Sequence, residues 1–136
     1  MSNQRRLNGV GKDIRITYRG WPGHFIASRH CVFRLNTLIE LGDVRVVVST
    51  VGNMIVPYSA VAEEVGCGRY YETMAFHASL RDNYWDANVG RQVDIPGTWT
   101  VDKINSLSDH KAQAMHEDAV QDISQRILSG ELTRYA

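Results

Sequence analysis

Two runs of β-branched and large apolar residues, 31–41 and 44–51, stand on either side of the dipeptide Gly42-Asp43. Residues of this kind favour strands, and the second run contains three consecutive valines. A glycine beside a short polar residue supplies the backbone conformations that a tight turn requires. The pattern therefore predicts a hairpin and commits the chain to an antiparallel sheet.

Further segments show the pattern of strands. Residues 13–19 alternate between apolar and polar side chains, which is typical of a strand with one buried face. Residues 70–80 and 84–89 flank a short polar turn and predict a second hairpin. Residues 92–95 lie between Gly90 and a Pro-Gly dipeptide and predict a short additional strand.

The C-terminal part of the chain predicts a single amphipathic helix. Apolar residues recur there at the spacing of one helical face: Ala112, Met115, Ala119, Ile123 and Ile127. Gly130 is suited to end this helix. Strands followed by one helix predict an α+β fold, in which an antiparallel β-sheet, a meander of hairpins, precedes a C-terminal amphipathic α-helix. Since one helix cannot cover a large sheet, the remaining face or an edge is expected to meet another copy.

The length of the chain, 136 residues, is enough for one domain with one hydrophobic core. Residues 1–12 are polar and lack a periodic apolar pattern, so we expect a flexible N-terminal lead-in before a single α+β ligand-binding domain over 13–136. The N-terminus has no apolar stretch of signal-peptide type, and no apolar run is long enough to cross a bilayer. The chain is therefore expected in the cytoplasm, without a membrane partner.

Charge and cysteine usage narrow the classes of partner. Fifteen basic and fifteen acidic side chains give a formal net charge of zero, whereas a duplex-DNA binder usually carries a basic excess that neutralises phosphates. A local group of arginines can still bind a small anion. Cys31 and Cys67 lack metal-ligand spacing, so neither a metal site nor a cofactor is predicted.

A search for catalytic constellations gives no candidate catalytic residue. The chain contains no nucleophile-elbow, phosphate-loop or zinc-protease motif. His110 and His116 are six positions apart and do not have the spacing of a metal pair on a helix. The run His116-Glu117-Asp118 is interpreted as the solvated face of the helix. We therefore predict that the protein is not an enzyme.

Arginine, asparagine and aromatic residues are interleaved along the predicted strands. Guanidinium groups bind phosphates, aromatic rings stack on bases, and an amide can bind a base edge or a ribose hydroxyl. The polar members are Arg34, Asn36, Arg45, Arg69, Asn88 and Arg91, and the aromatic members are Tyr70, Tyr71, Phe76, Tyr84 and Trp85. These residue types suit a nucleotide pocket, although strand aromatics more often belong to a core and strand arginines to a rim.

Three segments give the chain a resemblance to a known family. They are WPGHFIASRHCVFRLNTLIELGDVRVVVSTVGNM (21–54), GCGRYYETMAFHA (66–78) and YWDANV (84–89). In run and order they resemble the first described family of phage anti-Thoeris proteins. The resemblance implies a viral sponge that binds the cyclic ADP-ribose isomer made by TIR-domain defence enzymes and holds it unaltered. Some members of the family also bind cyclic oligonucleotides of the related CBASS defence at separate sites.

The resemblance also implies an assembly and a set of binding residues. Family members combine an N-terminal antiparallel sheet with C-terminal helical structure, and they form dimers that assemble into hexamers. Phe76 and Asn88 match the aromatic residue and the asparagine that line the family's signal pocket, and Arg34 and Arg69 are our candidates for phosphate contact. The C-terminal region before Gly130 offers few basic residues to complete this pocket: Lys103, Lys111 and Arg126.

Two other functions remain open from the sequence. One is an enzyme that degrades such a signal, with a histidine and a carboxylate as general acid and base. The lack of nucleophile motifs and of metal-ligand spacing favours a sponge over this enzyme. The other is a protein–protein inhibitor of a bacterial defence system. The zero net charge disfavours an inhibitor that mimics DNA, because such a protein should be acidic.

Overall fold

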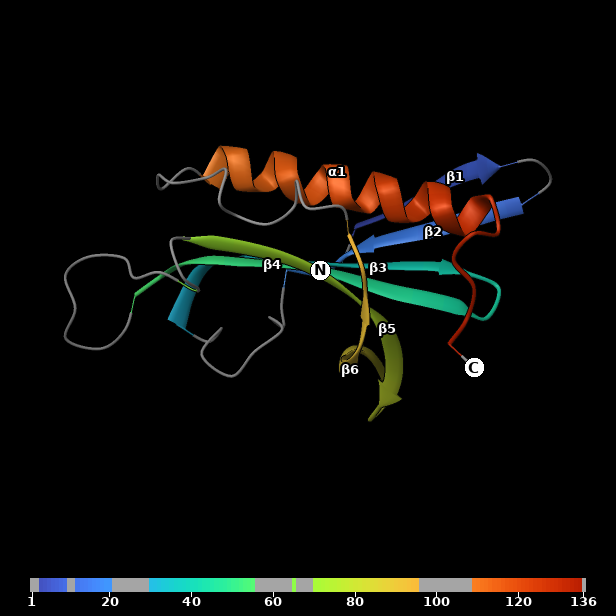
Figure 1. The fold of residues 1–136 in the computed structure, drawn as a ribbon, viewed down its shortest axis with the longest axis horizontal. Helices are drawn as coiled ribbons and strands as arrows, with labels where there is room; N and C mark the ends of the chain where they lie inside the picture. Colours follow the sequence, from blue (N-terminus) through green and yellow to red (C-terminus); the bar gives the residue numbers. More distant parts are fainter. Residues whose placement is uncertain are drawn as a thin grey trace.

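The computed structural model describes residues 3–9, 12–20, 30–55, 65, 70–95 and 109–135. Six antiparallel strands form one sheet in the order of the sequence, and a single helix lies across one face (Figure 1). The strands are β1 (Asn3–Gly9), β2 (Lys12–Tyr18), β3 (Cys31–Leu41), β4 (Val44–Met54), β5 (Tyr71–Arg81) and β6 (Tyr84–Val93), and the helix is α1 (Asp109–Leu128). This architecture confirms the predicted α+β class. No helix in these ranges is long and apolar enough to cross a membrane.

Both predicted hairpins are present. Leu41 of β3 and Val44 of β4 are the last paired residues before the turn, and Gly42 in this turn has a φ of 61°. The turn between β5 and β6 places Asp82 and Asn83 at φ values of 50° and 64°. Positive φ at both central residues is the geometry of the turns that suit the twist of a hairpin, and short polar residues tolerate it best.

The N-terminal segment differs from the expectation. Residues 3–9, which the sequence assigns to a flexible lead-in, form β1 and pair with β2 from Asn3–Tyr18 to Gly9–Lys12. The pairing uses backbone groups that every residue carries, so an edge strand can form without an apolar period. The lead-in prediction depended on that period and therefore missed the strand.

β6 is one strand where the sequence predicts two. Its pairing with β5 shifts between Phe76–Gln92 and Ala78–Ala87, so that residues 88–91 of β6 lie opposite a single residue of β5. Extra residues on one strand bend a strand pair and increase its twist. Accordingly, β5 and β6 curve away from the rest of the sheet in Figure 1.

α1 packs on the sheet through the apolar face that its spacing predicts. The five predicted apolar positions are all buried: Ala112, Met115, Ala119, Ile123 and Ile127. The main cluster joins α1 to strands β2 to β6 through Ile14, Ile16, Ile39, Val46, Val48, Ala75 and Val93. Gly130 ends the helix as predicted, with a φ of 83° and its N–H donating to the Ile127 carbonyl at 3.1 Å.

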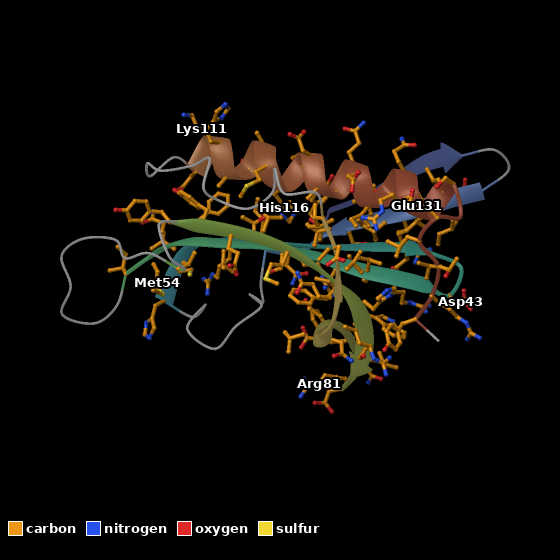
Figure 2. The ribbon with its side chains drawn as sticks, viewed as in Figure 1. Asp43, Met54, Arg81, Lys111, His116 and Glu131 are labelled. Atoms are coloured by element: carbon orange, nitrogen blue, oxygen red, sulfur yellow. The ribbon has the colours of Figure 1, made fainter. Side chains whose placement is uncertain are left out.

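A buried polar contact joins the middle of α1 to the sheet. His116 is fully buried between them (Figure 2). Its Nε2 lies 2.8 Å from the Thr37 hydroxyl and its Nδ1 lies 2.7 Å from the Thr50 hydroxyl. The Thr50 hydroxyl also lies 2.6 Å from that of Thr73. A neutral imidazole has one donor and one acceptor nitrogen, so either tautomer satisfies both ring nitrogens and the hydroxyl chain.

The interpretation of His116 as a solvated residue is therefore wrong. The helical period places position 116 beside the buried Met115 and Ala119, and the sheet offers hydroxyl partners that the sequence does not reveal. Burial lowers the pKa of His116 to about 3, so the ring is neutral at neutral pH.

Replacing Ile123 by alanine should lower the free energy of unfolding by about 2–5 kcal/mol, because this side chain is 0 % exposed and its removal leaves a cavity. Gln125→Ala, at an exposed position of the same helix, is the matched control and should change the value by less than about 0.5 kcal/mol. Denaturant titrations measure both. Equal stability of the two variants would contradict the packing of α1 on the sheet.

The His116 contact predicts a loss of stability in acid. An unfolded histidine takes up a proton near its ordinary pKa of about 6.5, whereas the folded ring stays neutral down to about 3, so falling pH favours the unfolded state across this window. From about pH 6.5 to about pH 5 this group alone should remove about 2 kcal/mol of stability.

The test compares unfolding free energies at both pH values. His116→Gln keeps a hydrogen-bonding side chain but does not titrate, so it should lose that part of the pH dependence. His110→Gln, exposed at the start of α1, should keep it. A His116→Gln protein with the parental pH dependence would show that the buried ring titrates normally.

Candidate functional site

Strands β4 and β5 separate at one end of the sheet. Their pairing ends at Val46–His77, while β5 continues beyond it. The β5–β6 hairpin then curves to the side away from α1 (Figure 1). Arg19, just after β2, donates from Nη1 to the Trp85 carbonyl at 2.7 Å and lies 4.3 Å over the Tyr84 ring. β2 and β6 are not neighbours in the sheet, so this contact holds the curved hairpin in place.

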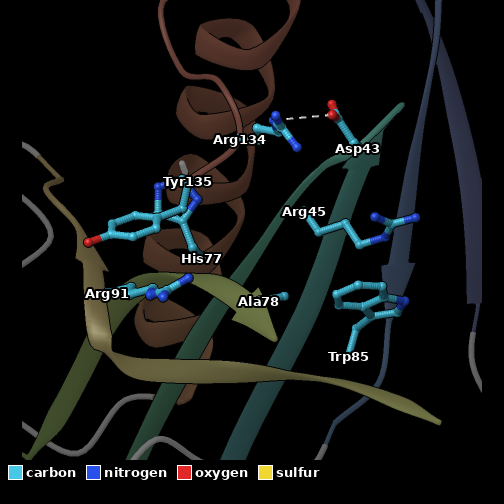
Figure 3. Close-up of a pocket in the computed structure, with 8 residues that line it drawn as sticks. All are labelled: Asp43, Arg45, His77, Ala78, Trp85, Arg91, Arg134 and Tyr135. Atoms are coloured by element: carbon cyan, nitrogen blue, oxygen red, sulfur yellow. Dashed lines mark ion pairs between the residues drawn. The ribbon is translucent and has the colours of Figure 1, made fainter. Parts of the chain in front are cut away.

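The separation of the strands opens a pocket of about 260 Å³. Its lining residues are Asp43, Arg45, His77, Ala78, Trp85, Arg91, Arg134 and Tyr135. Figure 3 shows two guanidinium–aromatic pairs on opposite sides of the pocket, with the small side chain of Ala78 between them. The pocket thus joins the β3–β4 hairpin, the β5–β6 hairpin and the C-terminal tail, residues 131–135.

The first pair consists of Arg45 and Trp85. The guanidinium of Arg45 lies 4.2 Å from the centroid of the Trp85 ring, and its Nε donates to Glu40 Oε2 at 3.0 Å. The side chains of Arg45 and Glu40 are only 28 % and 20 % exposed. The charge of Arg45 is therefore matched by a neighbour, and its main contribution to the pocket is to hold the indole ring.

The second pair consists of Arg91 and Tyr135. The guanidinium of Arg91 lies 4.0 Å over the Tyr135 ring, and the ring of His77 packs edge-on against Tyr135 at 5.4 Å. Among the residues that the structure describes, no carboxylate pairs with Arg91. Partial burial and the charge of Arg91 lower the pKa of His77, which favours a neutral imidazole beside an unneutralised cation.

The C-terminal tail brings Arg134 and Tyr135 to the pocket. Leu132 packs against the main apolar cluster, and its N–H donates to the Arg126 carbonyl at 2.9 Å. Beyond this anchor, Arg134 forms an ion pair with Asp43 at 3.5 Å, and the two side chains are 67 % and 69 % exposed. An exposed pair at this distance contributes little, typically about 0–1 kcal/mol. Arg134 is therefore available to a stronger anionic partner.

Two of the predicted site residues, Phe76 and Arg34, lie on the sheet face away from α1 and do not line the pocket. Phe76 is 2 % exposed and shares a cross-strand row with Val47 and Leu38. Arg34 is four residues from Leu38 along β3, which corresponds to about 13 Å of strand. The row that contains Phe76 is buried within the single chain. This row therefore offers no contact to a second copy, and the predicted contact through the rest of the face or a sheet edge stays a prediction.

Asn88 lies in the bulge of β6 and supports the bend. Its Nδ2 donates to Ser79 Oγ at 3.0 Å, and its Oδ1 accepts from the Gly90 N–H at 3.0 Å. These bonds use both ends of the amide for local structure. Arg69, the fourth predicted site residue, lies outside the described residues, so the structure does not place it.

Sequence analysis found part of the pocket. Arg45, Arg91 and Trp85 belong to the interleaved arginine and aromatic residues, and all three line the pocket. It missed His77, which no motif or metal-ligand spacing distinguishes from the other histidines. It also missed Arg134 and Tyr135, because the search for C-terminal basic residues stopped at Gly130. The sequence signal that could have indicated them is the dipeptide Arg134-Tyr135, an arginine beside an aromatic residue after the end of the helix.

The chain has no match among protein-family models, curated proteins or solved structures. Within the described ranges, no group of three or more His, Cys, Asp or Glu side chains could hold a metal ion. The chemistry of the pocket is therefore read from its own groups. Guanidinium groups can bind an anion, two aromatic rings can stack on a planar group, and one imidazole can exchange a proton.

Asn88→Ala should lower the free energy of unfolding by about 1–2 kcal/mol, because two hydrogen bonds that hold the bulge are lost. Val89→Ala, at an exposed neighbouring position, is the matched control and should melt close to the parent. Thermal melts of both variants make the comparison. Truncation of a residue that only faced a ligand would leave the melting temperature unchanged. Parental stability of Asn88→Ala would therefore favour the prediction that Asn88 lines a ligand pocket.

Proposed function

We propose that this protein is a phage-encoded sponge that captures a cyclic nucleotide immune signal, in the first instance a cyclic ADP-ribose isomer, and holds it without chemical change. The observation that carries the proposal is the opposition of two guanidinium–aromatic pairs across one pocket. The resemblance of three segments to anti-Thoeris proteins supports the same ligand class. CBASS cyclic oligonucleotides share its chemistry and are included as possible ligands.

The two pairs provide complementary contacts for such a ligand. Trp85 and Tyr135 offer ring faces or edges at which a base can stack, and each stacked base is worth about 1–3 kcal/mol. Arg91 and Arg134 offer forked donors to phosphate oxygens, and the geometry of a guanidinium allows two parallel hydrogen bonds to one phosphate. A ligand that carries both a base and a phosphate therefore uses both kinds of contact.

The size of the pocket bears on how the ligand is held. Its volume of about 260 Å³ is below the roughly 300–1,000 Å³ of common ligand sites. It suits one phosphate with an adjoining base, so the rest of a cyclic nucleotide would lie outside it. We include in the proposal a homodimer or homohexamer, in which a second copy encloses this remainder. The resemblance to the sponge family supports such an assembly.

Degradation of the signal is the alternative that one observation favours. His77 faces the pocket as a neutral imidazole, and this is the form that accepts a proton as a general base. Neither pair of contacts distinguishes binding from turnover, so the two functions are separated by the fate of the ligand.

Capture and release test the proposed function. The protein is incubated with a cyclic ADP-ribose isomer, and free ligand is measured before and after heat denaturation. A sponge removes free ligand and returns it intact after denaturation. Loss of ligand in both measurements would show an enzyme. Ligand that stays free throughout would exclude capture and favour the protein–protein inhibitor.

A matched pair of variants locates the site. Arg91→Ala should weaken capture about tenfold or more, the equivalent of about 1.4 kcal/mol. Arg81→Ala removes an exposed arginine from the same hairpin outside the pocket and should bind like the parent. If Arg91→Ala also keeps parental affinity, the ligand binds elsewhere, and the surroundings of Arg34 on β3 become the next candidate.

A further inference from the structure

One corner of the pocket combines three groups that favour an anion. Arg91 has no carboxylate partner in the described part of the chain, the ion pair of Arg134 with Asp43 is exposed and 3.5 Å long, and His77 packs edge-on against the Tyr135 ring that Arg91 covers. We propose that Arg91, Arg134 and His77 form a pyrophosphate-binding corner, and that the bound anion draws a proton onto His77. This inference rests on the pocket of the proposed function and names the part of the ligand that it recognises.

The position of Arg91 prepares it for a phosphate. Its guanidinium carbon lies 4.0 Å from the centroid of the Tyr135 ring, so the ring shields one side of the cation. An arginine held in this way has lost much of its side-chain freedom before a ligand arrives, which reduces the entropic cost of binding. The forked N–H groups of a guanidinium match the two oxygens of a phosphate.

The charges around His77 come from every element of the pocket. Arg91 approaches from β6, Arg134 and the Tyr135 ring from the tail, and Arg45 from β4. The carboxylate partners are Glu40, bound to Arg45, and Asp43, paired with Arg134. The pocket and its described ion pairs thus contain three guanidinium groups and two carboxylates. The guanidinium without a carboxylate partner among them is that of Arg91, on the side of His77.

Binding of an anion should favour the protonated form of His77. Partial burial and the charge of Arg91 both lower the pKa of His77, which favours the neutral ring before an anion binds. A pyrophosphate between Arg91 and His77 offsets the charge of Arg91 and accepts a hydrogen bond from the imidazolium, and both effects raise the pKa. Since the bound state then holds more of the proton than the free state, affinity should rise as the pH falls toward and below neutrality.

ADP-ribose is a suitable probe because its pyrophosphate is esterified at both ends and does not titrate near neutral pH. Titration calorimetry at one pH in two buffers with different ionisation enthalpies measures the protons taken up on binding. The parent should take up a fraction of a proton, and its affinity should be roughly three- to tenfold higher near pH 6 than near pH 8. Adenosine, which lacks the phosphates, should bind more weakly and without proton uptake.

Three variants assign the effect to the corner. His77→Gln should still bind ADP-ribose but lose both the proton uptake and the pH dependence, whereas His110→Gln, exposed on α1, should keep both. Arg91→Gln should lose about tenfold or more in affinity. Proton uptake that persists in His77→Gln, equal affinity of parent and Arg91→Gln, or no binding of ADP-ribose by the parent would each overturn the proposal.

The outcomes are separate from those of the proposed function. ADP-ribose is linear and is not the cyclic signal. Binding of ADP-ribose without capture of the cyclic ligand would therefore support the pyrophosphate-binding corner and contradict the proposed sponge. Capture of the cyclic ligand with no pH dependence would support the proposed sponge and contradict the pyrophosphate-binding corner.

Discussion

The packing of α1 across the sheet positions both the core and the pocket. Its apolar face closes the cluster that joins strands β2 to β6, and the buried His116 adds a directional contact in the middle of the helix. Apolar packing alone tolerates small shifts of a helix, whereas hydrogen bonds to two hydroxyls specify one position. The end of α1 then sets where the C-terminal tail begins, and Leu132 anchors the tail to the same cluster.

The bulge in β6 is the second determinant of the pocket. It allows β5 and β6 to leave the plane of the sheet, and the resulting gap beyond Val46–His77 is lined by side chains from three regions of the chain. Asn88 holds the bulge, and Arg19 holds the hairpin at its far end. Polar and cation–π contacts, rather than a second apolar core, therefore shape the walls of the pocket.

The distribution of charge separates structural arginines from the candidate binding groups. Arg45 and Arg126 have carboxylate partners at 3.0 Å and 2.9 Å, and Arg126 also donates to the Asp94 carbonyl at 2.9 Å. Arg91 has a ring beneath it and a neutral histidine beside it instead. In the described part of the chain no carboxylate balances this cation, and local departures of this kind concentrate at functional sites.

The sequence by itself determined the hairpins, the helix and its buried face, because periods of two and of three to four positions record which side chains meet a core. It also supplied Arg45, Arg91 and Trp85 as candidates through their residue types. Only the tertiary structure decided that β1 is a strand, that His116 is buried, and that Arg134 and Tyr135 meet His77. Those outcomes depend on backbone pairing, on hydroxyl partners from three other strands, and on the direction in which the chain leaves the helix. None of these leaves a local pattern in the amino-acid sequence.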